Sequence, residues 1–308
     1  MSIYEDLSSM LFLDQEDIIK YIKRAPYRYK VYSIPKKNNT GYREIAQPAK
    51  ELKILQRLAL RLPLLKLPVH HSAKAYVKNI GIKNNALTHE QSKYLLKMDF
   101  KNFFPSITEY DLVNHVRRYH GNLSKDDEIA LKKLFFYRRK HESISRLSIG
   151  APSSPFLSNS LLYEFDEKIH NTCSKSNIKY TRYADDLTFT TNIKGVLFEI
   201  PATVQTIINE LEYPKLNINH SKTVFSSKKN NRHVTGLVLT NDNKISLGRN
   251  KKRYIKSLVY KFKKSELTEK EIATLKGLIG FSKYIEPAFH HSLIEKYGKK
   301  TILSIEKH

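Results

Sequence analysis

The chain has 308 residues, of which 54 are Lys or Arg and 30 are Asp or Glu, giving a formal net charge of +24. Its content of 40% hydrophobic and 27% charged residues excludes a disordered chain and is enough for a sizeable core, in about two domains or one divided domain. A positive excess of this size indicates a polyanionic partner, for which nucleic acid fits better than a membrane surface.

Other features of the composition exclude further classes of protein. The single cysteine, Cys173, excludes a disulfide framework and a zinc-thiolate cluster within one chain. The most apolar stretch, LALRLPLLKLPV, is interrupted by charged residues and prolines and is too short to cross a bilayer. The N-terminal letters MSIYEDLSSM lack the features of a signal peptide, so we expect a cytoplasmic protein with no membrane partner.

The first third of the chain alternates helical and extended patterns. The pattern predicts a helix over 14–25, a β-hairpin over 29–48 with NNTG as its turn, and a helix over 49–62. Another helix is expected to begin near Asn84. The apolar run over 93–100 predicts a short strand that ends in Asp99.

The remaining elements are also short. Predicted helices cover 108–119, 154–169 and 204–213, and a hairpin over 178–191 carries two aspartates in its turn. Three short strands follow, in the segments KTVFSS, RHVTGLVLT and KISLG, and the last stretch, 249–308, is basic and helical. Because strands and helices alternate without a regular βαβ pattern, we expect an α+β core with a helical appendage.

The adjacent aspartates Asp185 and Asp186 need an explanation, because like charges repel unless cations neutralise them. Asp99 has the same setting, at the end of another predicted strand. Two such strands can bring the carboxylates to one sheet edge, where they would hold two divalent metal ions of the kind that polymerases and nucleases use for phosphoryl displacement. The alternative is an ordinary solvated turn, in which aspartate is common. The flanking strand formers, the second aspartate-tipped strand and the basic chain favour the metal site.

The letters YADD resemble the Tyr-X-Asp-Asp box of reverse transcriptases. Other segments resemble further motifs of that family in the same order: MDFKNFFPSI (98–107), GAPSSPFLSN (150–159), INHSKTVFS (218–226) and VTGL (234–237). NALTH at 85–89 and VTG resemble signatures of the retron type. The resemblance, over about 98–240, implies a right-hand polymerase fold with fingers at 1–92, an antiparallel-sheet palm at 93–248 that interleaves with the fingers, and a helical thumb at 249–308.

The resemblance also implies roles for residues at the aspartates. Asp99 and Asp185 would bind both metal ions, Asp186 would support the second ion, and the backbone carbonyl of Phe100 would be a further ligand. Hard oxygen ligands and triphosphate chemistry favour Mg²⁺ over Mn²⁺.

Three residues are implied in nucleotide binding. Phe104 would be the steric gate that selects deoxynucleotides, Arg43 would neutralise the triphosphate, and Lys222 would protonate the leaving pyrophosphate. Each has an ordinary alternative: core packing, a surface strand arginine and an exposed turn lysine. Ile149 stands where the family usually has a glutamine that helps to hold the nucleotide.

Other residues are implied in nucleic-acid binding. The primer grip would consist of Val234, Thr235 and Gly236. Asn85 and His89 would contact RNA or, in the interpretation that we prefer, hold or cap a local element. The candidate phosphate-binding residues in the basic segment, which has no interleaved acid, are Arg249, Lys251, Lys252, Arg253 and Lys256.

For function, the resemblance implies an RNA-directed DNA polymerase that uses dNTPs to copy part of a structured non-coding RNA into single-stranded DNA (msDNA). The primer would be a guanosine 2′-hydroxyl of the same RNA, which gives a branched product. The setting would be antiphage defence, with a separate effector protein and template trimming by host RNase H. The alternatives are a diversity-generating or abortive-infection reverse transcriptase, or a catalytically inactive RNA-binding scaffold.

Overall fold

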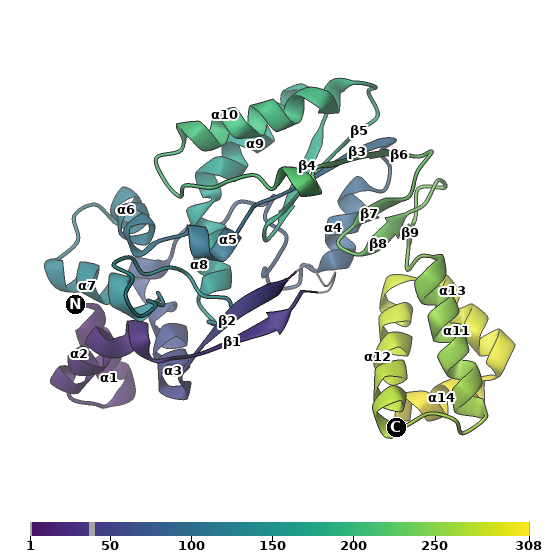
Figure 1. Cartoon of the computed structure of the whole chain (residues 1–308), viewed down its shortest axis with the longest axis horizontal. Coiled ribbons are helices and arrows are strands. Elements are labelled where there is room, and N and C mark those ends of the chain that lie inside the picture. The colour runs from purple at the N-terminus through teal and green to yellow at the C-terminus, as the bar shows by residue number, and fades with distance from the viewer. Residues whose placement is uncertain (1, 37–40, 308) are drawn as a thin grey trace.

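A computed structural model describes residues 2–36 and 41–307. It is an α+β structure in which one set of helices lies at each end and antiparallel sheets lie between them (Figure 1). In the described part of the chain, no helix is long and apolar enough to cross a membrane.

The N-terminal end is a helical bundle. Its members are α1 (Ile3–Leu11), α2 (Gln15–Arg24), α3 (Lys50–Ala59), α6 (Glu109–His120) and α7 (Lys125–Leu134). The predicted helices over 14–25, 49–62 and 108–119 are confirmed, although α3 ends earlier than expected. Their apolar stripes meet in one buried cluster, and the carboxylate of Asp127 accepts a hydrogen bond from the N-terminal amide of α1 at Ile3 (2.8 Å).

A long hairpin extends from this bundle. Strands β1 (Tyr29–Pro35) and β2 (Tyr42–Pro48) pair antiparallel along their whole length, as predicted. Of the predicted NNTG turn, residues 38–40 lie outside the described residues. The hairpin is largely exposed on both faces, and its base is joined to the loop after α7 by a hydrogen bond from the amide of Ala46 to the carbonyl of Ile149 (3.0 Å).

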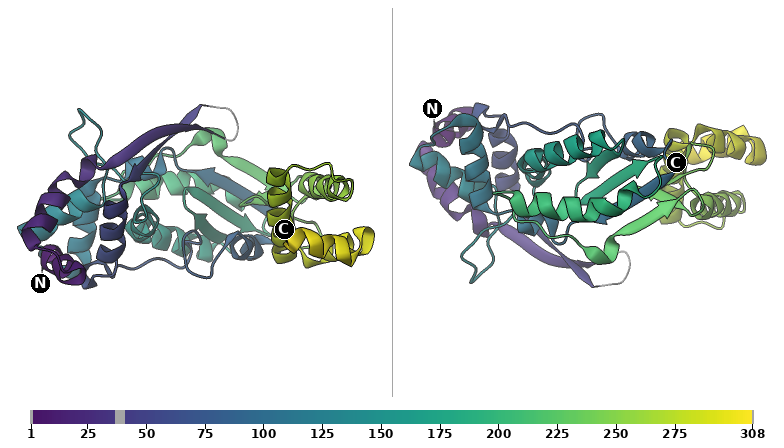
Figure 2. Two further views of the ribbon diagram at one scale, coloured as in Figure 1. Left: turned by 90° about the horizontal axis from the view of Figure 1, so that it is seen from below. Right: turned by 90° about the horizontal axis from the view of Figure 1, so that it is seen from above.

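The central sheet has the strand order β4-β5-β3-β6 and is antiparallel. Its strands are β3 (Tyr94–Asp99), β4 (Lys179–Tyr183), β5 (Asp186–Thr191) and β6 (Val224–Ser227). Helices α9 (Tyr163–Lys175) and α10 (Ile200–Glu210) cover one face (Figure 2). That face is apolar because side chains alternate along each strand: the buried Leu96, Met98, Leu187 and Phe189 all belong to the first cluster.

Three predicted elements differ from the structure. The single strand expected in RHVTGLVLT is a hairpin of two strands, β7 (Arg232–Val234) and β8 (Leu237–Leu239), because the chain turns at Thr235 and Gly236. The helix expected over 204–213 is α10, which begins earlier, at Ile200, and ends at Glu210. The helix expected over 154–169 is divided into α8 (Ser154–Leu161) and α9, with Leu162 between them outside helical geometry (φ −94°, ψ 11°). The apolar spacing of four could not reveal the break, because Leu157, Leu161 and Phe165 are buried in the same cluster on both sides of it.

A second cluster of buried residues links a small sheet to the C-terminal helices. The sheet has the order β7-β8-β9, with β7 (Arg232–Val234), β8 (Leu237–Leu239) and β9 (Ile245–Ser246). The helices are α11 (Arg249–Lys263), α12 (Glu269–Ile285), α13 (Pro287–Tyr297) and α14 (Lys299–Lys307). The cluster also includes Ala86 of α4 (Ile82–His89) and Leu95 of β3. The C-terminal helices thus share a core with the small sheet across the predicted boundary at residue 249.

Candidate active site

The aspartates of β3 and β5 meet at one edge of the central sheet. Asp99 and Asp186 are register partners in the antiparallel pair of β3 and β5, and Asp185 lies in the turn that joins β4 to β5. The turn is tied to β3 by a hydrogen bond from the amide of Phe100 to the carbonyl of Asp185 (3.1 Å). The predicted alignment of the three carboxyl groups is therefore confirmed.

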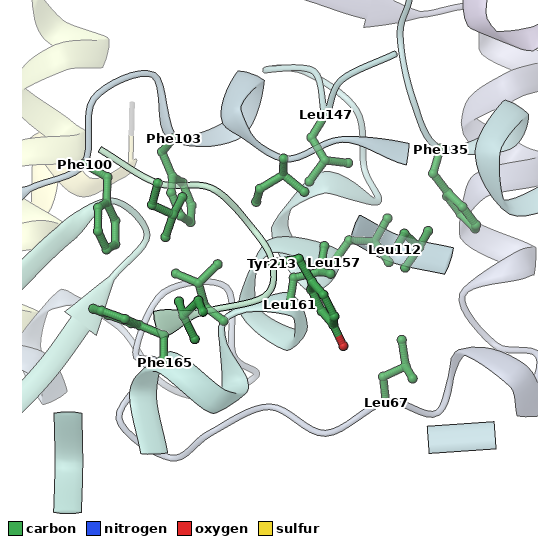
Figure 3. Packing of buried hydrophobic residues seen from close by; sticks show 14 of the residues in the cluster. Leu67, Phe100, Phe103, Leu112, Phe135, Leu147, Leu157, Leu161, Phe165 and Tyr213 are labelled. Carbon is green, nitrogen blue, oxygen red and sulfur yellow. The ribbon is translucent and has the colours of Figure 1, made fainter. Parts of the chain in front are cut away.

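Aromatic residues that follow Asp99 in the chain fix the position of this sheet edge. The ring of Phe100 packs against Phe165 of α9 with a centroid distance of 5.4 Å, and it stacks on Phe103 of α5 (Phe103–Ser106) at 5.8 Å (Figure 3). Because the ring is buried in the core, the backbone of Phe100 is fixed beside the carboxylates.

The three acids are close enough to affect one another's protonation. Burial, with the charges of Asp99 and Asp186, raises the pKa of Asp185 to about 6. Burial and the charge of Asp99 also raise the pKa of Asp186, while Lys97 and Lys222 act in the opposite direction. A bound cation would offset both the cost of burying the charged carboxylates and the repulsion between them.

Lys222 lies directly against Asp99. Its ammonium donates to both carboxylate oxygens at 2.9 Å, and Asn219 donates to one of them at 3.1 Å. Partial burial opposes the charged form of Lys222, but the hydrogen bond and the charges of Asp99 and Asp185 raise its pKa. Since the Lys222 side chain is 56% exposed, it has room to leave Asp99.

The donor set fits a hard divalent metal ion. The carboxylates of Asp99, Asp185 and Asp186 and the backbone carbonyl of Phe100 would supply only oxygen donors, which such an ion prefers. Across residues 2–36 and 41–307, no three His, Cys, Asp or Glu side chains already form a metal cage.

A cavity of about 380 Å³ is lined by residues of α3, of the loop before α8 and by Tyr76, and Tyr76 lies within reach of the charge of Asp185. Its wall includes Tyr76, Phe104 and Ile149, so the predicted gate residue and the residue in the usual glutamine position face the same space. The charge of Asp185 contributes to a raised pKa of Tyr76, after burial, whereas the charge of Arg43 lowers it. Arg43 is exposed on β2 and lies near the cavity without being one of the residues that line it.

Sequence reasoning missed two basic residues of this cavity. Lys53 and Arg57 of α3 line it, four residues apart on the side opposite the buried Leu52 and Leu55. Their spacing is visible in the sequence, but basic residues on the polar face of a helix are common and do not indicate a site by themselves.

The loop beneath the cavity needs a glycine. Gly150 has φ +126°, and a Cβ atom there would lie 3.1 Å from the carbonyl oxygen of Ala46. The letters GAP in this segment therefore allow the loop to approach β2 closely.

Asn85 and His89 are fully buried between α4 and the central sheet. Both side chains meet strand threonines: His89 contacts the hydroxyls of Thr181 and Thr190 at 2.7 Å each, and Thr181 donates to Asn85 at 2.7 Å. Burial lowers the pKa of His89 to about 3. Direct RNA contact by Asn85 or His89 does not agree with this burial, and the structural role preferred from sequence does.

The segment Val234–Gly236 forms the turn between β7 and β8. Val234 pairs with Leu237, and both residues between them have positive φ, 46° at Thr235 and 79° at Gly236, which is the geometry of a type I′ hairpin turn. A threonine is rare in this conformation. Its hydroxyl donates to the carbonyl of Ile82 at the start of α4 (3.2 Å).

The five basic residues predicted to bind phosphates all lie on α11 and fall into two groups. Arg249 and Arg253 are exposed. Lys252 instead donates to Glu286 at 2.5 Å, and its ammonium and that of Lys256 lie over the ring of Phe289; Lys251 lies over the ring of Phe281. The basic segment contains no acidic residue, but in the folded chain Glu286 pairs with its Lys252.

Comparisons with known proteins agree with this site. The model of the family described as reverse transcriptase (RNA-dependent DNA polymerase) matches residues 34–239. The chain is 44% identical over 306 residues to the Retron Ec83 reverse transcriptase of Escherichia coli, a match that covers 98% of each chain. The chain belongs to the reverse transcriptase family, in its retron type.

Further relatives support the same assignment. The Retron Ec73 reverse transcriptase of Escherichia coli is 34% identical over 309 residues, covering 96% of this chain and 95% of that one. This reverse transcriptase is therefore an enzyme, an RNA-directed DNA polymerase. The fold resembles apo telomerase from Candida tropicalis, with a TM-score of 0.51 at 14% identity over 88% of this chain and 58% of that one. This confirms the right-hand polymerase fold.

Proposed function

We propose that this enzyme copies part of a structured non-coding RNA into single-stranded msDNA, starting from a guanosine 2′-hydroxyl of the same RNA and leaving a branched RNA–DNA product. Support comes from the nearly full-length similarity to retron reverse transcriptases and from the intact set of three carboxylates at one sheet edge. The setting that we propose from the resemblance to the retron type is antiphage defence beside a separate effector protein, with host RNase H trimming the template.

In this proposal Asp99 and Asp185 hold two Mg²⁺ ions, with Asp186 and the carbonyl of Phe100 as additional ligands. The bound ions would activate the priming hydroxyl and neutralise the triphosphate. The chain contributes Lys222, which is charged beside Asp99. Once released from that carboxylate, Lys222 can donate a proton to the departing pyrophosphate.

In this proposal the nucleotide occupies the cavity that Tyr76 and Phe104 line. Lys53 and Arg57 on its wall, with Arg43 near its rim, attract the triphosphate by charge and hydrogen bonding. The ring of Phe104, which lines the cavity, is in this proposal the steric gate that excludes a ribose 2′-hydroxyl. Ile149 offers the nucleotide only an apolar surface, since its side chain has no hydrogen-bonding group.

The product duplex lies between the type I′ turn and the C-terminal helices in this proposal. Val234, Thr235 and Gly236 act as the primer grip, and α11–α14 act as the thumb. Within the predicted basic set of α11, Arg249 and Arg253 are exposed and can reach phosphates, and Lys261 and Lys263 near the end of the helix are exposed as well. Lys251, Lys252 and Lys256 are partly engaged by aromatic rings and Glu286 and contribute less.

The test is to co-express the chain with its upstream genomic DNA and to analyse the nucleic acid that copurifies. We expect a short DNA that resists RNase, shifts after treatment with a 2′,5′-debranching enzyme, and is absent when Asp185→Asn or Asp186→Asn protein is used. An unbranched DNA would contradict the priming step alone. RNA without DNA in all samples would contradict the polymerase function.

A further inference from the structure

Two buried charges lie behind the turn that carries Asp185. Arg182 of β4 and Asp166 of α9 are both 0% exposed. The guanidinium donates from Nε to Oδ1 at 2.9 Å and from Nη2 to Oδ2 at 2.6 Å, and Tyr180 donates to the same carboxylate at 2.7 Å. A buried pair of this kind is weak evidence for stability, because desolvation offsets the attraction. Its place beside the site calls for a different explanation.

The third guanidinium nitrogen reaches the turn itself. Nη1 of Arg182 donates to the carbonyl oxygen of Ala184 at 3.2 Å. Ala184 immediately precedes Asp185 and has φ 58°, a left-handed conformation that costs free energy for any residue with a Cβ atom. The hydrogen bond to Arg182 therefore holds the carbonyl of a strained residue next to a metal ligand.

Hydrogen bonds also connect the same nitrogen to the cavity wall. Nη1 of Arg182 donates to the side chain of Asn159 at 3.2 Å, and Asn159 donates to the carbonyl of Ala75 at 2.7 Å. Ala75 precedes Tyr76, which lines the cavity and is itself left-handed (φ 63°). The backbone of Arg182 adds hydrogen bonds to the segment 72–74. One guanidinium thus joins the aspartate turn to the wall of the cavity.

We propose that the Arg182–Asp166 pair is a positioning device that fixes Asp185 relative to the nucleotide cavity. The proposal rests on the proposed function of that cavity. Arg182 acts through the carbonyl of Ala184 and, by way of the Asn159 side chain, through that of Ala75, and it has no part in substrate binding. A lysine could keep the charge pair, but its single ammonium cannot serve Asp166, the turn and Asn159 in the geometry of a planar guanidinium.

Arg182→Lys is the informative variant, and Arg232→Lys is its matched control. Arg232 is also fully buried and also donates to backbone carbonyls, including that of Thr240 at 2.7 Å, but it has no hydrogen bond to the aspartate turn. We would measure the melting temperature, RNA binding, and single-nucleotide extension as a function of Mg²⁺ and dNTP.

For Arg182→Lys we expect unchanged RNA binding, a fall in kcat of about 10- to 100-fold, as for a misplacement on the order of 1 Å, and a higher Mg²⁺ concentration for half-maximal rate. For Arg232→Lys we expect a lower melting temperature with an unchanged Mg²⁺ requirement. Equal kcat and Mg²⁺ response in Arg182→Lys and wild-type protein would overturn the proposal, as would parallel decreases in both variants.

A paired variant covers the case in which Arg182→Lys does not fold. Arg182→Met with Asp166→Leu removes both charges and fills the volume with apolar groups, a change that often preserves stability. A folded, RNA-binding double variant with a raised Mg²⁺ requirement supports positioning, and one with wild-type extension overturns it. An inactive wild-type enzyme would overturn the proposed function together with this inference, whereas an active wild type with an unaffected Arg182→Lys would overturn this inference alone.

Discussion

At the scale of single residues, Phe104 is the side chain on which sugar selection should depend. Its ring lies on the cavity wall, at 5.3 Å from the ring of Phe103 and 6.5 Å from that of Tyr76, so neighbouring aromatics limit its movement. Phe104→Ala should admit ribonucleotides and improve the ratio of rNTP to dNTP incorporation by about 100-fold, the range in which a shaped pocket discriminates a hydroxyl.

Competition between rNTP and dNTP in a primer-extension assay measures that ratio. Phe225→Ala is a suitable control, because Phe225 is an exposed aromatic residue on β6 and does not line the cavity. An unchanged ratio in Phe104→Ala would show that the gate lies elsewhere on the wall.

The sequence predicts the acids but not most of their partners. Asp99, Asp185 and Asp186 stand out because each lies at the end of a strand pattern, which is a local signal. The pairs Lys222–Asp99 and Arg182–Asp166 depend on register and helix placement, and the first joins residues 123 positions apart. Such pairs leave no local pattern in the chain from which they could be predicted.

At the scale of elements, α4 is joined to the central sheet by His89, and this junction should respond to acid. Burial keeps the folded-state pKa of His89 near 3 against an ordinary value of 6.5. The neutral ring is therefore favoured by folding, so its contribution to stability is complete above pH 6.5 and is lost as the pH falls from there toward 3. Between pH 7 and pH 5 the loss amounts to about 2 kcal/mol.

Urea unfolding at the two pH values tests this with His89→Gln, which keeps hydrogen-bonding groups but does not titrate. The drop in unfolding free energy between pH 7 and pH 5 should be smaller in the variant than in the wild type by that amount. His70 and His115, whose pKa values burial lowers to about 4, remain in both proteins, so only the difference is attributed to His89. Equal drops would mean that His89 takes up a proton as readily in the folded protein as in the unfolded chain.

Elements can be predicted best where a local pattern decides them. Strand formers indicate the hairpin over 178–191, and apolar spacing indicates the helix over 204–213. The break at Leu162 cannot be predicted in this way, because burial on both sides preserves the helical spacing. The packing of β7–β9 onto α11–α14 is also hidden, since it depends on a shared core that a boundary drawn in chain order does not show.

At the scale of the whole molecule, the net charge of +24 raises the question of whether RNA affinity comes from total charge or from a few placed cations. Helix α11 allows the two explanations to be distinguished, because it carries exposed cations as well as a cation that is already paired. Arg249 and Arg253 of α11 are exposed, while Lys252 is already paired with Glu286 at 2.5 Å. Counterion release depends on cations that neutralise phosphates, so a cation paired with an acid should release few counterions.

We therefore expect Arg249→Gln with Arg253→Gln to weaken RNA binding and to reduce the salt dependence of log K by about one unit for each phosphate that is no longer neutralised. Lys252→Gln should change the salt dependence much less, and it should lower the melting temperature because it leaves Glu286 without its charged partner. Binding isotherms at several salt concentrations, together with melting curves, distinguish the cases. If all three substitutions reduced the salt dependence equally per charge, total charge rather than placement on α11 would govern affinity, and the C-terminal helices would have no defined path for the duplex.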